Sequence, residues 1–148
     1  MRGTDFRLIL VRPEDRILIE KLNEYKIDYE FRSKLTQSQL AATYSDCDIL
    51  YFASSYEGFG LPIIEAMASG RPVITSTIDP MKEVAGDAAC LVNYKDSNEV
   101  RSAITKITES RDYRDELIQR GLDRSRFFSA ERISPLYYEL YEEMVRNA

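Results

Sequence analysis

Residues 48–76 read DILYFASSYEGFGLPIIEAMASGRPVITS, and this stretch decides the fold. It opens with an apolar run of strand length at 48–53, passes through a turn with two glycines, and continues as a helix expected over 61–69. Gly70 marks the end of that helix, and a short β-branched strand follows at 73–76. Strand, turn, helix and strand in this order are typical of a parallel α/β sheet.

The same alternation extends to both sides of this stretch. Further strands are expected over 6–11, 28–32 and 90–93. Thr36 and Gln39 form a capping box that predicts a helix running to about Tyr44. Other helices are expected from Pro13, over 79–84, after Asp96, over 111–126 and over 130–147. Pro135 should kink or restart the last of them, with Ser134 as a new cap.

The pattern predicts one domain spanning residues 1–148. Its fold class is α/β, with a Rossmann-like parallel sheet covered by helices on both faces. A chain of 148 residues suits a domain of this size. Ligands of such sheets bind beyond the carboxyl ends of the strands, which directs attention to the turn after 48–53.

Composition excludes several classes of function. The net charge of −5 argues against binding nucleic acid. No run approaches the roughly 20 apolar residues of a membrane span, and no signal-peptide pattern opens the chain. The sequence has no histidine, which removes Ser-His-Asp triads and H-E-x-x-H metal sites. Cys47 and Cys90 form no C-x-x-C pair, so we expect reduced thiols and a cytoplasmic location.

The turn after residues 48–53 has the features of a phosphate site. Gly58 and Gly60 let the backbone approach a ligand closely. The helix that begins near Leu61 offers unpaired N–H groups and the positive end of its dipole. Glu57 and Glu65 flank these groups and can accept hydrogen bonds from sugar or ribose hydroxyls. Most G-x-G turns merely connect elements, however, so the spacing alone leaves the function open.

A resemblance sharpens the interpretation. Residues 57–74, EGFGLPIIEAMASGRPVI, resemble the signature E-G-F-G-L-P-x-x-E-A-M-A-x-G-x-P-V-I of the family 4 (group 1) retaining glycosyltransferases, which have the GT-B fold. Flanking segments at 44–48, 80–89 and 127–141 are also similar to that family. The resemblance covers almost the whole chain, as the C-terminal domain of such an enzyme.

The resemblance implies a role for each residue of the turn. Glu57 would be the catalytic residue and would contact hydroxyls of the donor sugar, while Glu65 would bind the ribose hydroxyls. Four amides would hold the sugar and the diphosphate: those of Gly58, Phe59, Gly60 and Leu61. A loop after the second strand would lie near the nucleobase: Ser33, Lys34 and Leu35. The donor is a nucleotide diphosphate-sugar, and neither a metal nor another cofactor is expected.

The chain also departs from the family pattern. Ala53 and Ala130 stand where the family usually has Pro and Trp. The family's first strand, with an Arg and a Lys that neutralise the diphosphate, has no counterpart, and the acceptor-binding N-terminal domain is absent. We therefore expect the isolated chain to bind a nucleoside diphosphate weakly or not at all and to lack activity. Without that strand, the strands at 6–11 and 48–53 must pair directly, borrow a strand, or leave an edge exposed.

Other functions remain open at this point. One is another enzyme of the same fold, such as a nucleotide-sugar epimerase or a phosphorylase-like enzyme. A second is a non-catalytic module that binds nucleotide-sugar or acts as a scaffold. A phospho-acceptor receiver domain is disfavoured, because Arg12 and Pro13 follow the first strand where it needs acidic residues. Peripheral membrane association of the full-length protein, dimerisation of the fragment, and the identities of base, sugar and acceptor are left open.

Overall fold

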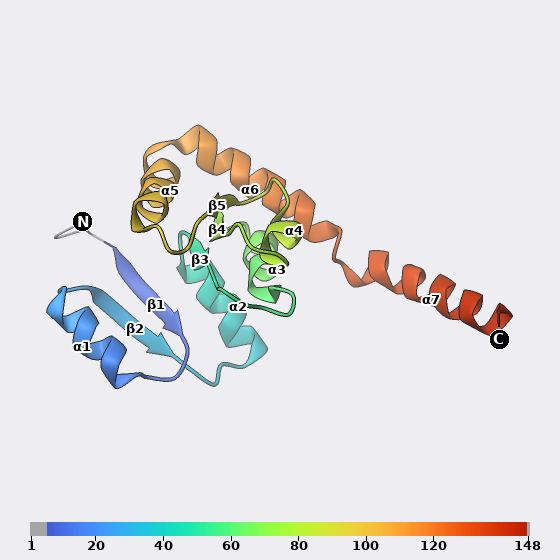
Figure 1. Cartoon of the computed structure of the whole chain (residues 1–148), viewed down its shortest axis with the longest axis horizontal. Helices are drawn as coiled ribbons and strands as arrows, with labels where there is room; N and C mark the ends of the chain where they lie inside the picture. Colours follow the sequence, from blue (N-terminus) through green and yellow to red (C-terminus); the bar gives the residue numbers. More distant parts are fainter. Residues whose placement is uncertain (1–5, 148) are drawn as a thin grey trace. The chain divides into compact units, whose positions relative to one another are not determined.

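The computed structural model describes residues 6–147 and shows an alternation of strands and helices along the chain (Figure 1). It divides into two compact units, residues 1–43 and residues 44–148, which are described separately. The parallel α/β class predicted from the sequence is confirmed, because every strand pair in both units is parallel.

The first unit contains a two-stranded sheet and the helix that connects its strands. Strand β1 (Arg7–Val11) pairs with β2 (Asp28–Arg32) over the full length of both. Helix α1 (Arg16–Glu24) forms the crossover. A crossover helix of this kind is what two adjacent parallel strands require.

The start of α1 differs from the prediction that placed Pro13 at its first position. Asp15 is the N-cap, and its carboxylate accepts a hydrogen bond from the Leu18 amide at 3.0 Å. The helix therefore begins at Arg16, because an aspartate cap satisfies an amide of the first turn and proline cannot.

Helix α2 (Gln37–Asp46) begins at the predicted capping box. The Thr36 amide donates to Gln39 Oε1 at 2.8 Å, and the Gln39 amide donates to Thr36 Oγ1 at 3.3 Å. The two side chains thus satisfy backbone amides reciprocally at the helix start. The helix extends slightly beyond its expected end, and its last residues belong to the second unit.

The second unit is built on a three-stranded parallel sheet of order β3-β4-β5. The strands are β3 (Leu50–Phe52), β4 (Val73–Ser76) and β5 (Cys90–Val92). The helices packed on it are α3 (Leu61–Ala68), α4 (Met81–Ala85), α5 (Ser97–Glu109) and α6 (Arg111–Arg126). The central strand β4 is buried along its whole length.

Helices cover both faces of this sheet, as the sequence predicted. Val73 of β4 lies in one buried cluster with residues of α3 and α4. Its neighbour Ile74 lies in a second cluster with residues of α5 and α6. Helix α6 also contacts α3, where a Cβ at Gly121 would come within 3.1 Å of Met67 Cγ. The absence of a side chain at Gly121 therefore lets the two helices approach closely.

The strands β1 and β3 lie in different sheets. In the first unit β1 pairs with β2, and in the second unit β3 pairs with β4 at the edge of its sheet. Tyr51 of β3 is 49% exposed.

Helix α7 (Ala130–Arg146) follows α6 after a short turn (Figure 1). It buries none of its side chains. One face of it is apolar and exposed, with Leu136, Tyr137, Leu140, Tyr141 and Met144. It runs through Pro135 as one helix, so a restart capped by Ser134 is not observed. In the part of the chain that is described, no helix has the length and apolar character needed to cross a bilayer.

Candidate functional site

The turn between β3 and α3 ends at residue 60, where the backbone conformation favours glycine. Gly60 is the N-cap of α3 and has φ 95° and ψ 41°, which is left-handed backbone. Residues with a Cβ adopt that conformation at a cost, whereas glycine does not. No side chain caps this helix start. Pro62 has no N–H and the Ile63 amide donates to the Gly60 carbonyl at 3.0 Å, so the Leu61 amide and the positive end of the helix dipole are what this helix start offers an anion.

Gly58 differs from Gly60 in a way that bears on function. Its backbone lies outside the left-handed region, and a Cβ built on it would meet nothing within 4 Å. The fold of the second unit therefore sets no steric demand for glycine at this position. A missing side chain here leaves the backbone of the turn accessible to a ligand.

Two carboxylates flank the turn, and their surroundings differ. Glu57 is half-buried in the loop before α3. Glu65 lies one turn into α3, and its Oε2 accepts a hydrogen bond of 2.8 Å from the Tyr44 hydroxyl. Burial, followed by the hydrogen bond to Glu65 and its charge, raises the pKa of Tyr44 above its ordinary range. Tyr44 is therefore a neutral donor to the carboxylate at physiological pH.

This turn lies in a region that matches a known family. The sequence profile of the family described as glycosyl transferases group 1 matches residues 4–124. The chain belongs to this family. A relative in it, O-antigen chain mannosyltransferase B of Escherichia coli, is 32% identical over 99 residues, which are 67% of this chain and 26% of that protein. The chain thus spans about a quarter of the length of that mannosyltransferase.

Solved structures confirm the predicted GT-B type of fold. Sucrose-phosphate synthase from Thermosynechococcus elongatus matches with a TM-score of 0.82 at 27% identity, over 96% of this chain and 39% of that one. The C-terminal domain of a group 1 family glycosyl transferase from Francisella tularensis matches with a TM-score of 0.65 at 28% identity, over 74% of this chain and 58% of that one.

The group 1 glycosyltransferase turn is held in shape by local contacts. The Tyr56 amide donates to Ser54 Oγ at 3.3 Å, and that hydroxyl donates to the Tyr56 carbonyl at 3.0 Å. The ring of Phe59 meets the ring of Phe128 edge-on, with centroids 5.8 Å apart. Phe128 packs in turn against the buried cluster that contains Ile63. The turn is therefore anchored between its two glycines as well as at its start.

Six of the predicted site residues lie together on the β3–α3 segment of this group 1 glycosyltransferase chain: Glu57, Gly58, Phe59, Gly60, Leu61 and Glu65. The predicted nucleobase loop belongs to the first unit and follows β2. Ser33 and Lys34 are exposed there, Leu35 is half-buried, and Lys34 has φ 53°. The role of that loop stays a prediction.

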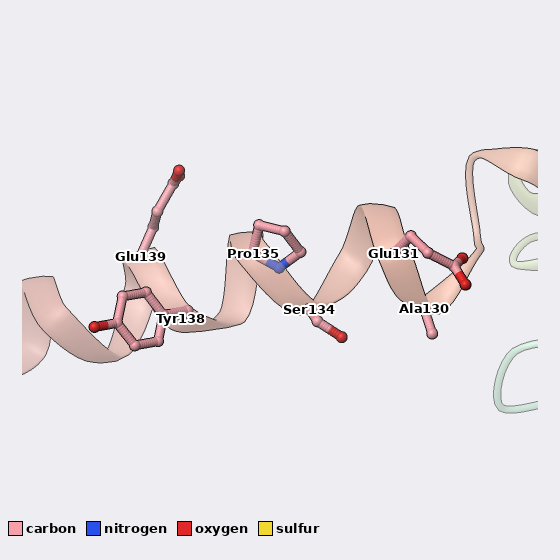
Figure 2. Close-up of a pocket in the computed structure, with 6 residues that line it drawn as sticks. All are labelled: Ala130, Glu131, Ser134, Pro135, Tyr138 and Glu139. Atoms are coloured by element: carbon pink, nitrogen blue, oxygen red, sulfur yellow. The ribbon is translucent and has the colours of Figure 1, made fainter.

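A hollow of about 610 Å³ lies elsewhere, along α7. Figure 2 shows its six lining residues on successive turns of that one helix: Ala130, Glu131, Ser134, Pro135, Tyr138 and Glu139. None of the predicted donor-binding residues lines it, and a single helix cannot enclose a nucleotide. Across residues 6–147, no group of three or more His, Cys, Asp or Glu side chains is placed to hold a metal ion.

Sequence reasoning gave no role to Tyr44 or to Phe128. Each contacts a residue distant in the chain, Glu65 for Tyr44 and Phe59 for Phe128. No helical or strand periodicity relates such pairs, so spacing alone could not reveal them. Tyr44 drew attention only as part of the segment 44–48 that resembles the family.

Proposed function

We propose that this chain is the donor-binding, C-terminal domain, residues 1–148, of a two-domain retaining glycosyltransferase that transfers a hexose. The observation that carries the proposal is the β3–α3 turn. It combines an uncapped helix start after Gly60 with a glycine at 58 for which the fold has no steric need. The likeness to the C-terminal domain from Francisella tularensis supports the position in the enzyme.

The proposal assigns the donor's parts to the turn. The amides from Gly58 to Leu61 hold the sugar and the diphosphate, since amides at a helix start favour phosphate. Glu57, the catalytic residue of the proposal, contacts hydroxyls of the donor sugar. Glu65 binds the ribose hydroxyls, and the loop Ser33–Leu35 lies near the base. The relative from Escherichia coli is a mannosyltransferase, so mannose is the first sugar to test.

The chemistry fits these groups. Transfer from a nucleotide-sugar passes through an oxocarbenium-like state while the diphosphate departs, so positioning and stabilisation of the leaving charge dominate catalysis. The start of α3 supplies part of that stabilisation. A retaining reaction in which the acceptor attacks from the donor's own face needs no histidine base, and the sequence has no histidine. The two cysteines of the sequence, Cys47 and Cys90, form no C-x-x-C pair and are expected to be reduced thiols, which supports a cytoplasmic location in this proposal.

In this proposal the isolated chain is an incomplete catalyst. The Arg and Lys that neutralise the diphosphate, and the acceptor site, belong to parts of the enzyme outside residues 1–148. We expect this chain to bind a nucleoside diphosphate with a Kd of about 1 mM, a binding free energy of about −4 kcal/mol. No transferase activity is expected from it.

A titration of the ¹⁵N-labelled chain with UDP, GDP and ADP, followed by NMR, tests the proposal. At least one nucleotide should shift the amide signals of Gly58, Phe59, Gly60 and Leu61, and calorimetry should give the weak Kd. The assignment of the site fails if none of the three shifts those signals at about 10 mM, ten times the expected Kd. A low-micromolar Kd would refute the expected weak binding and would show that the Arg and Lys side chains outside residues 1–148 contribute little to affinity. An assay of sugar transfer by the full-length protein distinguishes an enzyme, which should be active, from a non-catalytic binding module, which should not.

A further inference from the structure

Tyr44 is joined to the turn by one short hydrogen bond. Its hydroxyl, on the last part of α2, donates to Oε2 of Glu65 on α3 at 2.8 Å. Bonds from neutral donors to carboxylates at this distance are strong and directional. The ring of Tyr44 packs against the buried cluster beneath α3, so the hydroxyl approaches Glu65 from a side chain that is itself held.

A second contact fixes the same part of α2. The guanidinium of Arg71, just beyond the end of α3, donates to the carbonyl of Ser45 at 3.1 Å. Adjacent residues of α2 are thus tied to both ends of the segment from Glu65 to Arg71. The position of the Tyr44 hydroxyl relative to the Glu65 carboxylate is therefore set by the fold.

The bond leaves Glu65 able to bind a ligand. A carboxylate has about four lone-pair sites, and Tyr44 can donate only one proton. Oε1 and the remaining site on Oε2 stay available to hydroxyls. Tyr44 thus restricts the rotation of the Glu65 side chain without using up its capacity to accept hydrogen bonds, which lowers the entropy lost when a ligand binds.

We infer that Tyr44 is a positioning residue for nucleotide recognition, which holds the Glu65 carboxylate ready to accept hydrogen bonds from the ribose hydroxyls of the donor. The inference rests on the proposed function and adds the residue that orients its ribose contact. Burial and the charge of Glu65 keep Tyr44 protonated, because both raise its pKa. Tyr44 touches no reacting atom in this scheme, so its effect appears in affinity for the ribose.

The test compares each nucleoside diphosphate with its 2′,3′-dideoxy counterpart, using the chain itself and NMR titration. The wild-type chain should bind the ribose form of UDP, GDP or ADP about tenfold more tightly than the dideoxy form. Tyr44→Phe, which keeps the ring, should weaken binding of the ribose form about three- to tenfold and leave the dideoxy form unchanged. In a Glu65→Ala background, Tyr44→Phe should have no further effect.

Tyr113→Phe is the matched control. Tyr113 is also half-buried, with its hydroxyl beside the Cys90 thiol, but it packs against the cluster on the opposite face of the sheet. It should not change the preference for ribose. The inference is wrong if Tyr44→Phe weakens both nucleotides equally, which indicates a purely structural role, or changes neither. If Glu65→Ala leaves the ribose preference intact, the ribose assignment in the proposed function fails as well.

Discussion

Replacing Gly60 by alanine should destabilise the second unit, whereas the same change at Gly58 should not. Both glycines lie in one turn, but their backbones differ. Gly60 has φ 95°, and a Cβ there would come 3.2 Å from Ile63 Cδ1 and 3.7 Å from Met81 Cγ. A Cβ at Gly58 would meet nothing within 4 Å.

The size of the effect at Gly60 follows from three contributions. Holding alanine in a left-handed conformation costs about 1–2 kcal/mol. Crowding the terminal methyl of the fully buried Ile63 side chain costs about 1 kcal/mol, the low end of the overpacking range, while the 3.7 Å approach to Met81 is ordinary contact. Alanine also lowers the entropy of the unfolded chain, which offsets about 0.4–1 kcal/mol. The net loss should be about 1–3 kcal/mol.

Urea unfolding followed by far-ultraviolet circular dichroism measures this loss, since the chain has no tryptophan to report it. Gly60→Ala should lower the midpoint by about 0.5–1.5 M, and Gly58→Ala should change the free energy of unfolding by no more than about 0.5 kcal/mol. Gly58→Ala should nevertheless weaken binding of the nucleoside diphosphate, because its methyl group obstructs the backbone. Equal destabilisation by both variants would refute the reasoning.

Two further predictions concern aromatic residues. Phe128→Ala should remove the edge-on contact with Phe59, worth about 0.5–1.5 kcal/mol beyond buried area, and broaden the NMR signals of the turn, whereas Phe127→Ala should leave those signals unchanged. Burial raises the pKa of Tyr113 from 10.0 to about 12, so the stability this residue contributes is complete below pH 10 and is lost as pH rises towards 12. The free-energy difference between wild type and Tyr113→Phe should therefore shrink over that pH range in urea titrations. A difference between the two proteins that stays constant over that pH range would contradict this.

The elements of the second unit were predictable because their signals are local. The strand over 73–76 is β-branched and buried, and the helix before it ends at Ala68, two residues before Gly70, which has φ 67°. The start of α1 was misplaced because two local signals compete there. Proline suits a first helical position, but Asp15 supplies an acceptor for an amide and so determines the start.

The candidate site was predictable only in part. Its sequence segment, from Glu57 to Glu65, is continuous, so a strand–turn–helix pattern and a family resemblance were enough to find it. The hydrogen bond from Tyr44 to Glu65 joins two residues that are 21 positions apart in the chain. Tertiary packing brings them together, and no short window of sequence contains it.

The alternation along β4 limits how this protein can change in length. Val73 and Ile74 point into opposite clusters, and successive side chains of a strand always face opposite ways. Deleting or inserting one residue between Gly70 and Val73 would turn the side chains of β4 to the opposite faces of the sheet. Each side chain would then meet the buried cluster that is shaped for its neighbour. That connection should therefore tolerate substitutions more readily than insertions or deletions, even though it is a loop.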